Sequence, residues 1–118
     1  MKTENVVRDK SFSFAVEIVW VYKFLIMKKE FDLGRQLLRS GTSISANIEE
    51  AIGSSSRKEF LHKMTIAYKE CRETHYWIRL MAATNILCKS DTENLLQKAD
   101  ELLRIIGRIQ KSVKESLK

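Results

Sequence analysis

The chain has 118 residues, of which 44% are hydrophobic and 31% are charged, with four glycines and no proline. This length suits a single domain, and the composition excludes a collagen-like chain, low-complexity disorder and a disulfide-dense scaffold. The lack of proline argues against a turn-rich β fold, whose corners usually contain proline and glycine. The formal charge of +6 makes polyanions candidate partners, although a merely solvated surface is the commoner explanation of such a surplus.

Four helical segments fill the chain and are separated by short polar connections. The expected spans are 9 or 11 to 28, 33 to 52, 57 to 87 and 90 to 116, so that residues 1–8 form an N-terminal extension and 9–118 a single domain. Asp32 is the expected N-cap of the second helix. Residues 56–59 match a capping box, in which a serine and a glutamate satisfy each other's backbone amide groups at a helix start.

Apolar residues recur within these segments at alternating steps of three and four, as they do in the seams of helical bundles. The third segment gives Leu61, Met64, Tyr68, Cys71, His75, Ile78 and Ala82, the fourth gives Leu95, Ala99, Leu102, Ile106, Ile109 and Val113, and the second gives Leu33, Leu37, Ile44, Ile48 and Ala51 or Ile52. Seams of this kind let helices interlock at small crossing angles. Together with the short connections, they predict an all-α protein, an antiparallel up-down-up-down four-helix bundle.

The first segment differs from the others because apolar residues surround it on more than one side. A helix in a small bundle buries only one stripe in its own core, so a second apolar face needs another cover. Large exposed apolar patches usually mark association between proteins. We therefore expect a subunit interface that includes Phe14, Val16 and Trp20, with Trp77 from the third segment, while cover by loops or by residues 1–8 is the alternative.

No motif for catalysis is present in the sequence. The chain lacks a glycine-rich phosphate loop, a nucleophile elbow and a His-Glu-x-x-His metal helix. Cys71 and His75 lie one helical turn apart, but a zinc site needs three or four protein ligands and no second pair exists. Glu59 and His62 have the spacing of a di-iron ligand pair, again without a second pair. We expect no metal, no cofactor and no enzymatic activity.

The cysteines and an acidic doublet at 49–50 have structural explanations. Cys71 and Cys88 are 17 residues apart, which on one helix means about 25 Å, beyond the reach of a disulfide. We expect both thiols to be reduced and buried, as in a cytoplasmic protein. The doublet is expected to form ion pairs with an arginine at 57, 72 or 79.

The sequence carries no convincing membrane or targeting segment. The most apolar run, residues 14–27, contains Glu17 and Lys23 and is shorter than the ~20 residues that cross a bilayer. The polar start of the chain does not resemble a signal peptide. We expect a soluble cytoplasmic protein without a membrane partner.

Basic residues are organised along the last predicted helix. Arg104, Arg108, Lys111 and Lys118 follow steps of four, three and seven, so they form a stripe beside the apolar seam. Phosphate contacts require only such donors on a shared surface. A second basic group at the start of the third helix is the alternative site, and it consists of Arg57, Lys58 and Lys63. Lysines on solvated helix faces are also common without any such role.

The middle of the chain resembles a bacterial protein family. The matching residues are QLLR at 36–39, SISANIEE at 43–50, SRKEFL at 56–61, IA at 66–67 and KECRETHYWIRL at 69–80. They resemble the core motif of the four-helix bundle proteins encoded in intervening sequences of 23S ribosomal RNA genes, also labelled S23 ribosomal proteins. The resemblance covers residues 10–112. Ala51 stands where the family usually has glycine, and residues 27–31 lack its common Phe-Pro.

This resemblance implies a left-handed bundle that assembles as a ring, commonly a homopentamer. The family is also similar to accessory proteins of diversity-generating retroelements, which are basic pentameric rings that bind nucleic acid and partner with a reverse transcriptase. Arg39, Asn47, Glu50 and Glu73 match the motif and transfer as framework or interface residues. The label does not imply that the protein is part of the ribosome.

The expected function is therefore that of a homo-oligomeric scaffold, a pentamer by resemblance, that binds RNA or DNA through a basic surface. RNA is the preferred ligand. The alternative is an adaptor that binds only proteins, a reverse transcriptase among them, and whose charge serves solubility.

Overall fold

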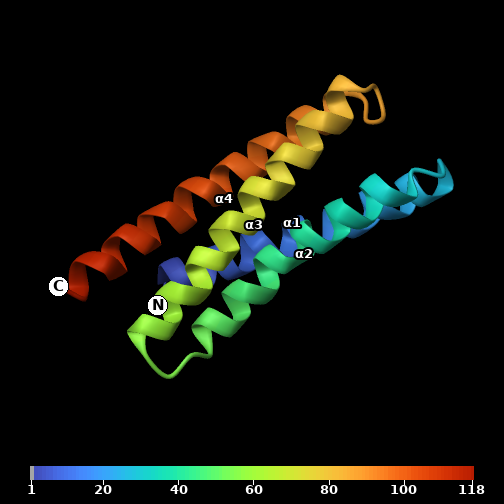
Figure 1. Cartoon of the computed structure of the whole chain (residues 1–118). Coiled ribbons are helices and arrows are strands. Elements are labelled where there is room, and N and C mark those ends of the chain that lie inside the picture. Colours follow the sequence, from blue (N-terminus) through green and yellow to red (C-terminus); the bar gives the residue numbers. More distant parts are fainter. Residues whose placement is uncertain (1) are drawn as a thin grey trace.

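The computed structural model describes residues 2–118, and within them four α-helices account for almost the whole chain (Figure 1). The helices are α1 (Lys2–Met27), α2 (Phe31–Ile52), α3 (Arg57–Ala83) and α4 (Lys89–Ser116). The two chain ends and the α2–α3 turn lie at one end of the molecule, whereas the α1–α2 and α3–α4 turns lie at the other (Figure 1). The prediction of an all-α, up-down-up-down bundle is confirmed.

The first helix begins earlier than the sequence predicted. Residues 2–8, expected as an extension, form the opening turns of α1, and Met1 lies outside the described residues. Val7 is fully buried, so extending the helix removes additional apolar surface from water. Ser11 does not mark the helix start, because its hydroxyl donates to the Arg8 carbonyl at 3.0 Å from within the helix.

The start of α2 is also corrected by the structure. Phe31 is its first residue, and Glu30 is the N-cap without a side-chain hydrogen bond. Asp32, the expected cap, lies in the first turn, where its Oδ1 accepts a hydrogen bond from Arg35 Nη2 at 2.8 Å. Its carboxylate still lies near the positive end of the helix dipole, which explains why an acidic residue favours this position.

The predicted capping box at the start of α3 is half formed. Ser56 Oγ accepts a hydrogen bond from the Glu59 amide at 3.0 Å, as expected of a cap. The Glu59 carboxylate does not bind the Ser56 amide in return. Its Oε2 lies 3.2 Å from Ser55 Oγ instead. The Glu59 side chain thereby binds the residue that precedes the N-cap.

The two turns at the far end of the bundle each contain a left-handed residue. Lys29 has a φ of 63° and Asn85 has a φ of 62°, a conformation that a right-handed helix cannot include. α3 therefore ends at Ala83, earlier than the predicted Leu87, and α4 begins at Lys89. Asparagine tolerates this conformation better than most residues, which explains its place in the turn.

The core confirms the predicted seam of α4 and shifts that of α3. All of the predicted α4 seam residues are buried: Leu95, Ala99, Leu102, Ile106, Ile109 and Val113. In α3, burial follows Met64, Ala67, Cys71, Thr74, Ile78 and Met81. The predicted Tyr68, His75 and Ala82 each lie one residue after a buried position and are only partly buried. Their places are taken by smaller or more flexible side chains that fit between closely packed helices.

Small residues on α2 let its neighbours approach closely. A Cβ built at Gly41 would lie 2.7 Å from Ile18 Cγ2 and 2.9 Å from Ile18 Cγ1, so α1 packs directly against the α2 backbone. On the other side of α2, Thr74 Oγ1 donates to Ser40 Oγ at 2.9 Å inside the core. This hydrogen bond explains how a threonine and a serine can be fully buried.

The contact between α1 and α4 closes the bundle and is the loosest of the four helix contacts. Ion pairs bridge it, with Lys10 Nζ 3.2 Å from Glu101 Oε2 and Lys98 Nζ 2.5 Å from Glu17 Oε2. Figure 1 shows the α1–α2 and α3–α4 hairpins diverging toward the end that holds their turns. The bundle is thus held mainly by contacts between helices that follow one another in the chain.

Candidate nucleic-acid interface

A groove between α3 and α4 collects basic side chains on one side of the bundle. It consists of two adjoining openings of about 480 and 520 Å³, and Tyr68, Gly107 and Lys111 line both of them. The cations that line this groove, which we call the basic groove, are Arg72, Arg104, Arg108, Lys111, Lys114 and Lys118. Asp100 and Glu115 are its lining carboxylates. The groove therefore carries a strong local excess of positive charge.

Helical spacing places these side chains together. Most of the cations follow one another along the outer side of α4, where steps of three and four residues keep side chains on the same face. Arg72 completes the groove from α3. Asp100 is already engaged, because its Oδ1 lies 3.0 Å from His75 Nε2 across the α3–α4 contact.

The groove cations have no side-chain partner among the described residues. Within residues 2–118, none of the groove cations forms an ion pair or a hydrogen bond with another side chain. Elsewhere, Arg39, Lys63 and Lys98 each bind a carboxylate. The groove thus gathers six cations, none of which pairs with a carboxylate among the described residues. Such a surface is suited to an external anion.

The structure brings together the predicted stripe and adds residues to it. Arg104, Arg108, Lys111 and Lys118 all line the groove, as their spacing along one helix suggested. Arg72 and Tyr68, which sequence reasoning did not assign to this surface, come from the neighbouring helix. Their place depends on the register between α3 and α4, for which the sequence offers no direct signal. Lys114 was also missed, although its spacing from Lys111 and Lys118 could have indicated it.

The alternative basic group does not form a single surface. Lys63 faces α2, where its Nζ binds Glu50 Oε1 at 2.8 Å. Lys58 is exposed and does not line the basic groove. Arg57 lies near the end of α4, where its Nε donates to Ser116 Oγ at 3.1 Å. These residues point in different directions, so the structure does not bring them together as a site.

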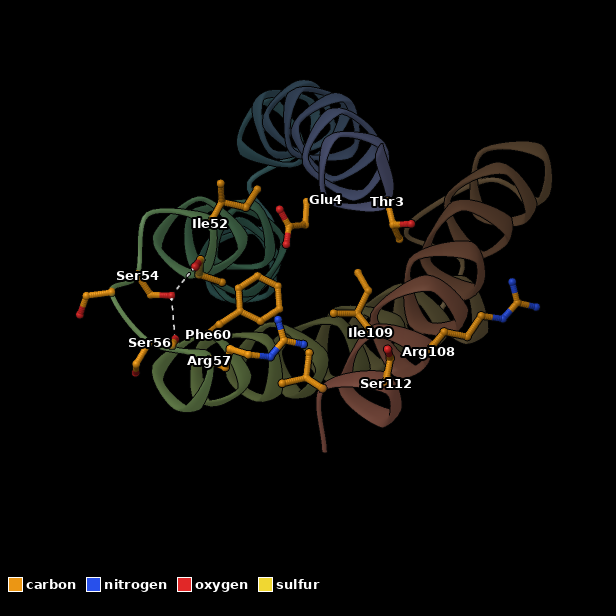
Figure 2. A pocket seen from close by; sticks show the side chains of 13 residues that line it. Thr3, Glu4, Ile52, Ser54, Ser56, Arg57, Phe60, Arg108, Ile109 and Ser112 are labelled. Atoms are coloured by element: carbon orange, nitrogen blue, oxygen red, sulfur yellow. Dashed lines mark hydrogen bonds between the residues drawn. The ribbon is translucent and has the colours of Figure 1, made fainter. Parts of the chain in front are cut away.

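Arg57 belongs instead to a cavity at the end of the bundle, where all four helices contribute side chains (Figure 2). The cavity measures about 630 Å³, and its apolar walls include Ile52, Phe60 and Ile109. Figure 2 shows the Arg57 guanidinium directed toward the cavity, whereas the Arg108 side chain extends away from it. Arg108 therefore presents its charge to the outside of α4 and not to this cavity.

The groups considered for catalysis or metal binding have structural partners. Burial, reinforced by Asp100 and opposed by Arg72, raises the pKa of the Cys71 thiol to about 12, so the thiol stays protonated at neutral pH. His75 accepts a hydrogen bond at Nδ1 from Arg79 Nε at 3.1 Å. No group of three or more potential metal ligands occurs among residues 2–118. Likewise, no helix in the described part of the chain is long and apolar enough to cross a membrane.

The cysteine expectation is correct for one residue and wrong for the other. Both cysteines are free, and Cys71 is buried, with its Sγ donating to the Ala99 carbonyl at 3.5 Å. Cys88 is exposed because it lies at the N-cap of α4, just after the left-handed turn. It was assigned to the core because the third helix was expected to run close to it.

The motif residues carried over from the family resemblance make contacts inside the bundle. Arg39 forms ion pairs with Glu73 and with Glu70, and Trp77 Nε1 donates to Glu73 Oε2 at 3.1 Å. Asn47 Nδ2 donates to the Ser43 carbonyl at 2.8 Å. Glu50 binds Lys63, so the expectation that residues 49–50 pair with an arginine is wrong for Glu50.

Glu70 is the least well satisfied carboxylate of this polar group. Its Oε2 is buried without a hydrogen bond within residues 2–118, and the Arg39 Nη1 atom lies 3.7 Å away. Burial is the main cause that raises the pKa of Glu70, the charge of Glu73 adds to it, and Arg39 opposes it. The α2–α3 contact therefore holds a carboxylate whose charged form is disfavoured.

The predicted interface on the first helix is partly corrected. Phe14 is only 1% exposed and belongs to the core of its own chain, because it lies on the same side of α1 as Ile18. Val16 and Trp77 are partly buried, whereas Trp20 is 63% exposed. Apolar residues at steps of three and four along one outward side form what we call the aromatic face of α1, which consists of Phe12, Val16, Trp20, Phe24 and Met27. Phe24 and Met27 were missed because the apolar run looked continuous.

Comparison with known proteins identifies the family. The model of the family described as 23S rRNA-intervening sequence protein matches residues 3–108. A crystal structure of a protein with unknown function from the S23 ribosomal protein family of Bacteroides thetaiotaomicron VPI-5482 is 44% identical, with a TM-score of 0.90 over 92% of this chain and 98% of that chain. No curated protein matches this sequence. The chain therefore belongs to the 23S rRNA-intervening sequence protein family.

Proposed function

We propose that this protein is a non-enzymatic, homo-oligomeric bundle that binds nucleic acid through the basic groove. The observation that carries the proposal is the set of groove cations that have no carboxylate partner. Phosphate groups are the anions that a row of arginine and lysine side chains meets on an extended backbone. RNA is the first ligand to test, because the family is described by its relation to 23S rRNA.

Oligomerisation strengthens this proposal. One chain has a formal charge of +6, and a single groove offers only a few phosphate contacts. When identical grooves repeat around an assembly, the second and later contacts become effectively intramolecular, and the overall affinity rises. The pentamer implied by the family resemblance would repeat the groove five times.

The aromatic face of α1 is the surface proposed for assembly. Trp20 is 63% exposed and Met27 is 78% exposed, next to Phe24 on the same side of the helix. Apolar side chains that cluster on a surface are typical of interfaces. The same face could instead bind a different protein, as the adaptor alternative requires, so its role needs a direct test.

The assembly test compares the molar mass of the wild type with that of Trp20→Glu by light scattering after gel filtration. We expect the wild type at several times 13.7 kDa, most simply five, and the variant at a lower mass with unchanged helical circular dichroism. Leu117→Glu is the matched control, because Leu117 is exposed at the far end of α4. A monomeric wild type at micromolar concentration would contradict the proposal of a homo-oligomer.

The binding test uses fluorescence anisotropy with a structured RNA at salt concentrations from about 50 to 300 mM. Arg104→Glu/Arg108→Glu/Lys111→Glu should weaken binding at least about tenfold. The slope of the logarithm of the binding constant against the logarithm of the salt concentration should become less negative, by about 0.7 for each lost phosphate contact on a single strand or about 0.9 on a duplex. The control Lys23→Glu/Arg35→Glu/Lys89→Glu makes the same change in net charge at exposed positions outside the groove.

The outcomes separate the possible explanations. A strong loss of RNA affinity in the groove variant alone supports the basic groove as the binding site. An equal loss of affinity in the groove variant and the control would mean that net charge, and not the groove, determines binding. No binding by the wild type at the lowest salt would favour the adaptor that binds only proteins.

A further inference from the structure

Tyr68 is the aromatic residue of the basic groove. It lines both openings, with Arg72, Arg104 and Arg108 in one and Lys114 and Lys118 in the other. The base of its side chain packs against the core, and the side chain is only partly buried. Its hydroxyl makes no hydrogen bond within residues 2–118. The ring is therefore a flat apolar surface between cations.

Gly107 lies beside this ring on the α4 side and lines both openings of the groove. A Cβ built at Gly107 would lie 3.8 Å from Tyr68 Cε2, so a longer side chain there would extend over the ring. The described glycines have no positive φ, so the backbone does not require glycine at this position. Glycine is also among the least favourable residues inside a helix. Gly107 therefore keeps the α4 wall of the groove free of a side chain next to Tyr68.

We infer that the basic groove selects unpaired nucleotides, with one base stacked on the Tyr68 ring and the neighbouring phosphates bound by the flanking cations. This inference rests on the proposed function of the groove. Phosphate contacts alone would bind single strands and duplexes alike. In a duplex, the bases are stacked on each other and cannot reach a ring in a groove, whereas an unpaired base can.

Such an arrangement predicts that the groove binds strands with accessible bases more tightly than strands without them, whatever the base sequence. Every base has a flat face that can stack on an aromatic ring, and the groove cations read only the backbone. The neighbouring arginines would also hold the phosphates on either side of the stacked base, which fixes the strand along the groove. Tyr68 would thereby turn a general polyanion surface into one that distinguishes single strands.

The experiment measures anisotropy at low salt with two single-stranded probes of about 12 nucleotides, a length typical of single-strand sites. One probe is oligo-deoxyadenylate, and the other is an abasic oligonucleotide that keeps the phosphates and lacks the bases. We expect the wild type to bind the adenylate about tenfold more tightly than the abasic probe. Tyr68→Leu should abolish this ratio without changing abasic binding, whereas Tyr68→Phe should keep it.

A second variant protects the test against misfolding. Gly107→Leu leaves the Tyr68 residue unchanged but places a side chain against its ring, and it too should abolish the preference for the adenylate. Thermal melts monitored by circular dichroism show whether each variant is folded, and Gly107→Leu decides the question if Tyr68→Leu is not.

The results distinguish this inference from the proposed function. Equal binding of both probes by the wild type would overturn the stacking role of Tyr68 while leaving nucleic-acid binding intact. A preference that survives in both folded Tyr68→Leu and Gly107→Leu would place base contacts elsewhere and would also overturn it. Failure of the wild type to bind either probe would overturn this inference, whereas the proposed function is overturned only if the structured RNA also fails to bind.

Discussion

Gly41 and Gly107 both lie inside a helix and face a neighbouring helix, yet their surroundings are opposite. An added Cβ at Gly41 would meet Ile18 Cγ2 at 2.7 Å, whereas at Gly107 the neighbouring atom, Tyr68 Cε2, is 3.8 Å away. The first glycine lets α1 and α2 approach to full contact. The second leaves a groove between α3 and α4. The same residue type thus serves close packing in one helix pair and access in the other.

Charged residues also differ between these two helix pairs. Across the α2–α3 contact, Arg39 and Lys63 are matched by Glu73 and Glu50. On the outer side of α3 and α4, the cations of the basic groove are left without carboxylates among the described residues. One side of α3 therefore pairs its charges within the bundle, whereas the groove side leaves its cations unpaired.

The largest expected effect comes from filling the space at Gly41. Gly41→Ala should lower the free energy of unfolding by up to about 2 kcal/mol, because overpacking costs about 1–3 kcal/mol and the better helix propensity of alanine returns about 1 kcal/mol. Ile18 is β-branched and fully buried, so it cannot turn away from the new methyl group. Urea unfolding measures the change, and a stabilised variant would contradict the close contact.

The next effect contrasts two arginines. Arg39→Gln should cost about 1 kcal/mol of unfolding free energy, because the carboxylates of Glu70 and Glu73 then repel each other without a cation. Arg104→Gln should change stability by no more than about 0.5 kcal/mol, since Arg104 has no partner to lose. Urea unfolding of both variants in one buffer makes the comparison. An equal loss in both would mean that the groove cations have structural roles.

The third expected effect is an increase in the free energy of unfolding, opposite in sign to the first two. Gly107→Ala should raise the unfolding free energy by about 0.8–1.0 kcal/mol, because alanine is the better helix former and its methyl group has room. The same substitution type is thus expected to destabilise α2 and to stabilise α4. A thermal melt of each variant tests this directly, and a drop in melting temperature for Gly107→Ala would show that the groove is tighter than described.

The smallest expected effect concerns Glu70 and depends on pH. Its pKa is raised from the ordinary value of 4.5, chiefly by burial, so the folded state favours the protonated form. The stability contributed by this group is full below its unfolded pKa and is lost as pH rises through the folded value. Glu70→Gln should therefore unfold at higher urea than the wild type near pH 7, and the difference should shrink near about pH 4. A constant difference at both pH values would exclude titration of Glu70 as its cause.

The buried seams of α4 and α3 show which core residues a sequence pattern can predict. The α4 seam was predicted in full because its apolar residues alternate with charged ones, so a single stripe stands out. In α3, Tyr68 and His75 looked like seam residues, but each has a polar end, and the core instead takes Ala67 and Thr74. The buried Thr74 hydroxyl lies 2.8 Å from the Glu70 carbonyl one turn earlier and 2.9 Å from Ser40 Oγ on α2. The contact with Ser40 cannot be predicted from the sequence of α3 alone.

In the basic groove too, the sequence predicts what one helix carries but not how two helices are packed. Arg104, Arg108 and Lys111 could be grouped from their spacing because one helix carries them all. The contributions of Arg72 and Tyr68 depend on how α3 is positioned along α4, which is set by packing between the helices. The prediction that Phe14 lies in an interface failed for a related reason. A helix with apolar residues all round does not reveal which side its neighbours cover.

The α1–α4 contact has a consequence for how the molecule opens. Its ion pairs, Lys10 with Glu101 and Lys98 with Glu17, hold together helices that share little other contact, and added salt weakens such surface attractions. Regions with few buried contacts are the first to open in native-state fluctuations. Backbone amide hydrogens of α1 should therefore exchange with deuterated water sooner than those of α2, and the lead should widen as ionic strength rises.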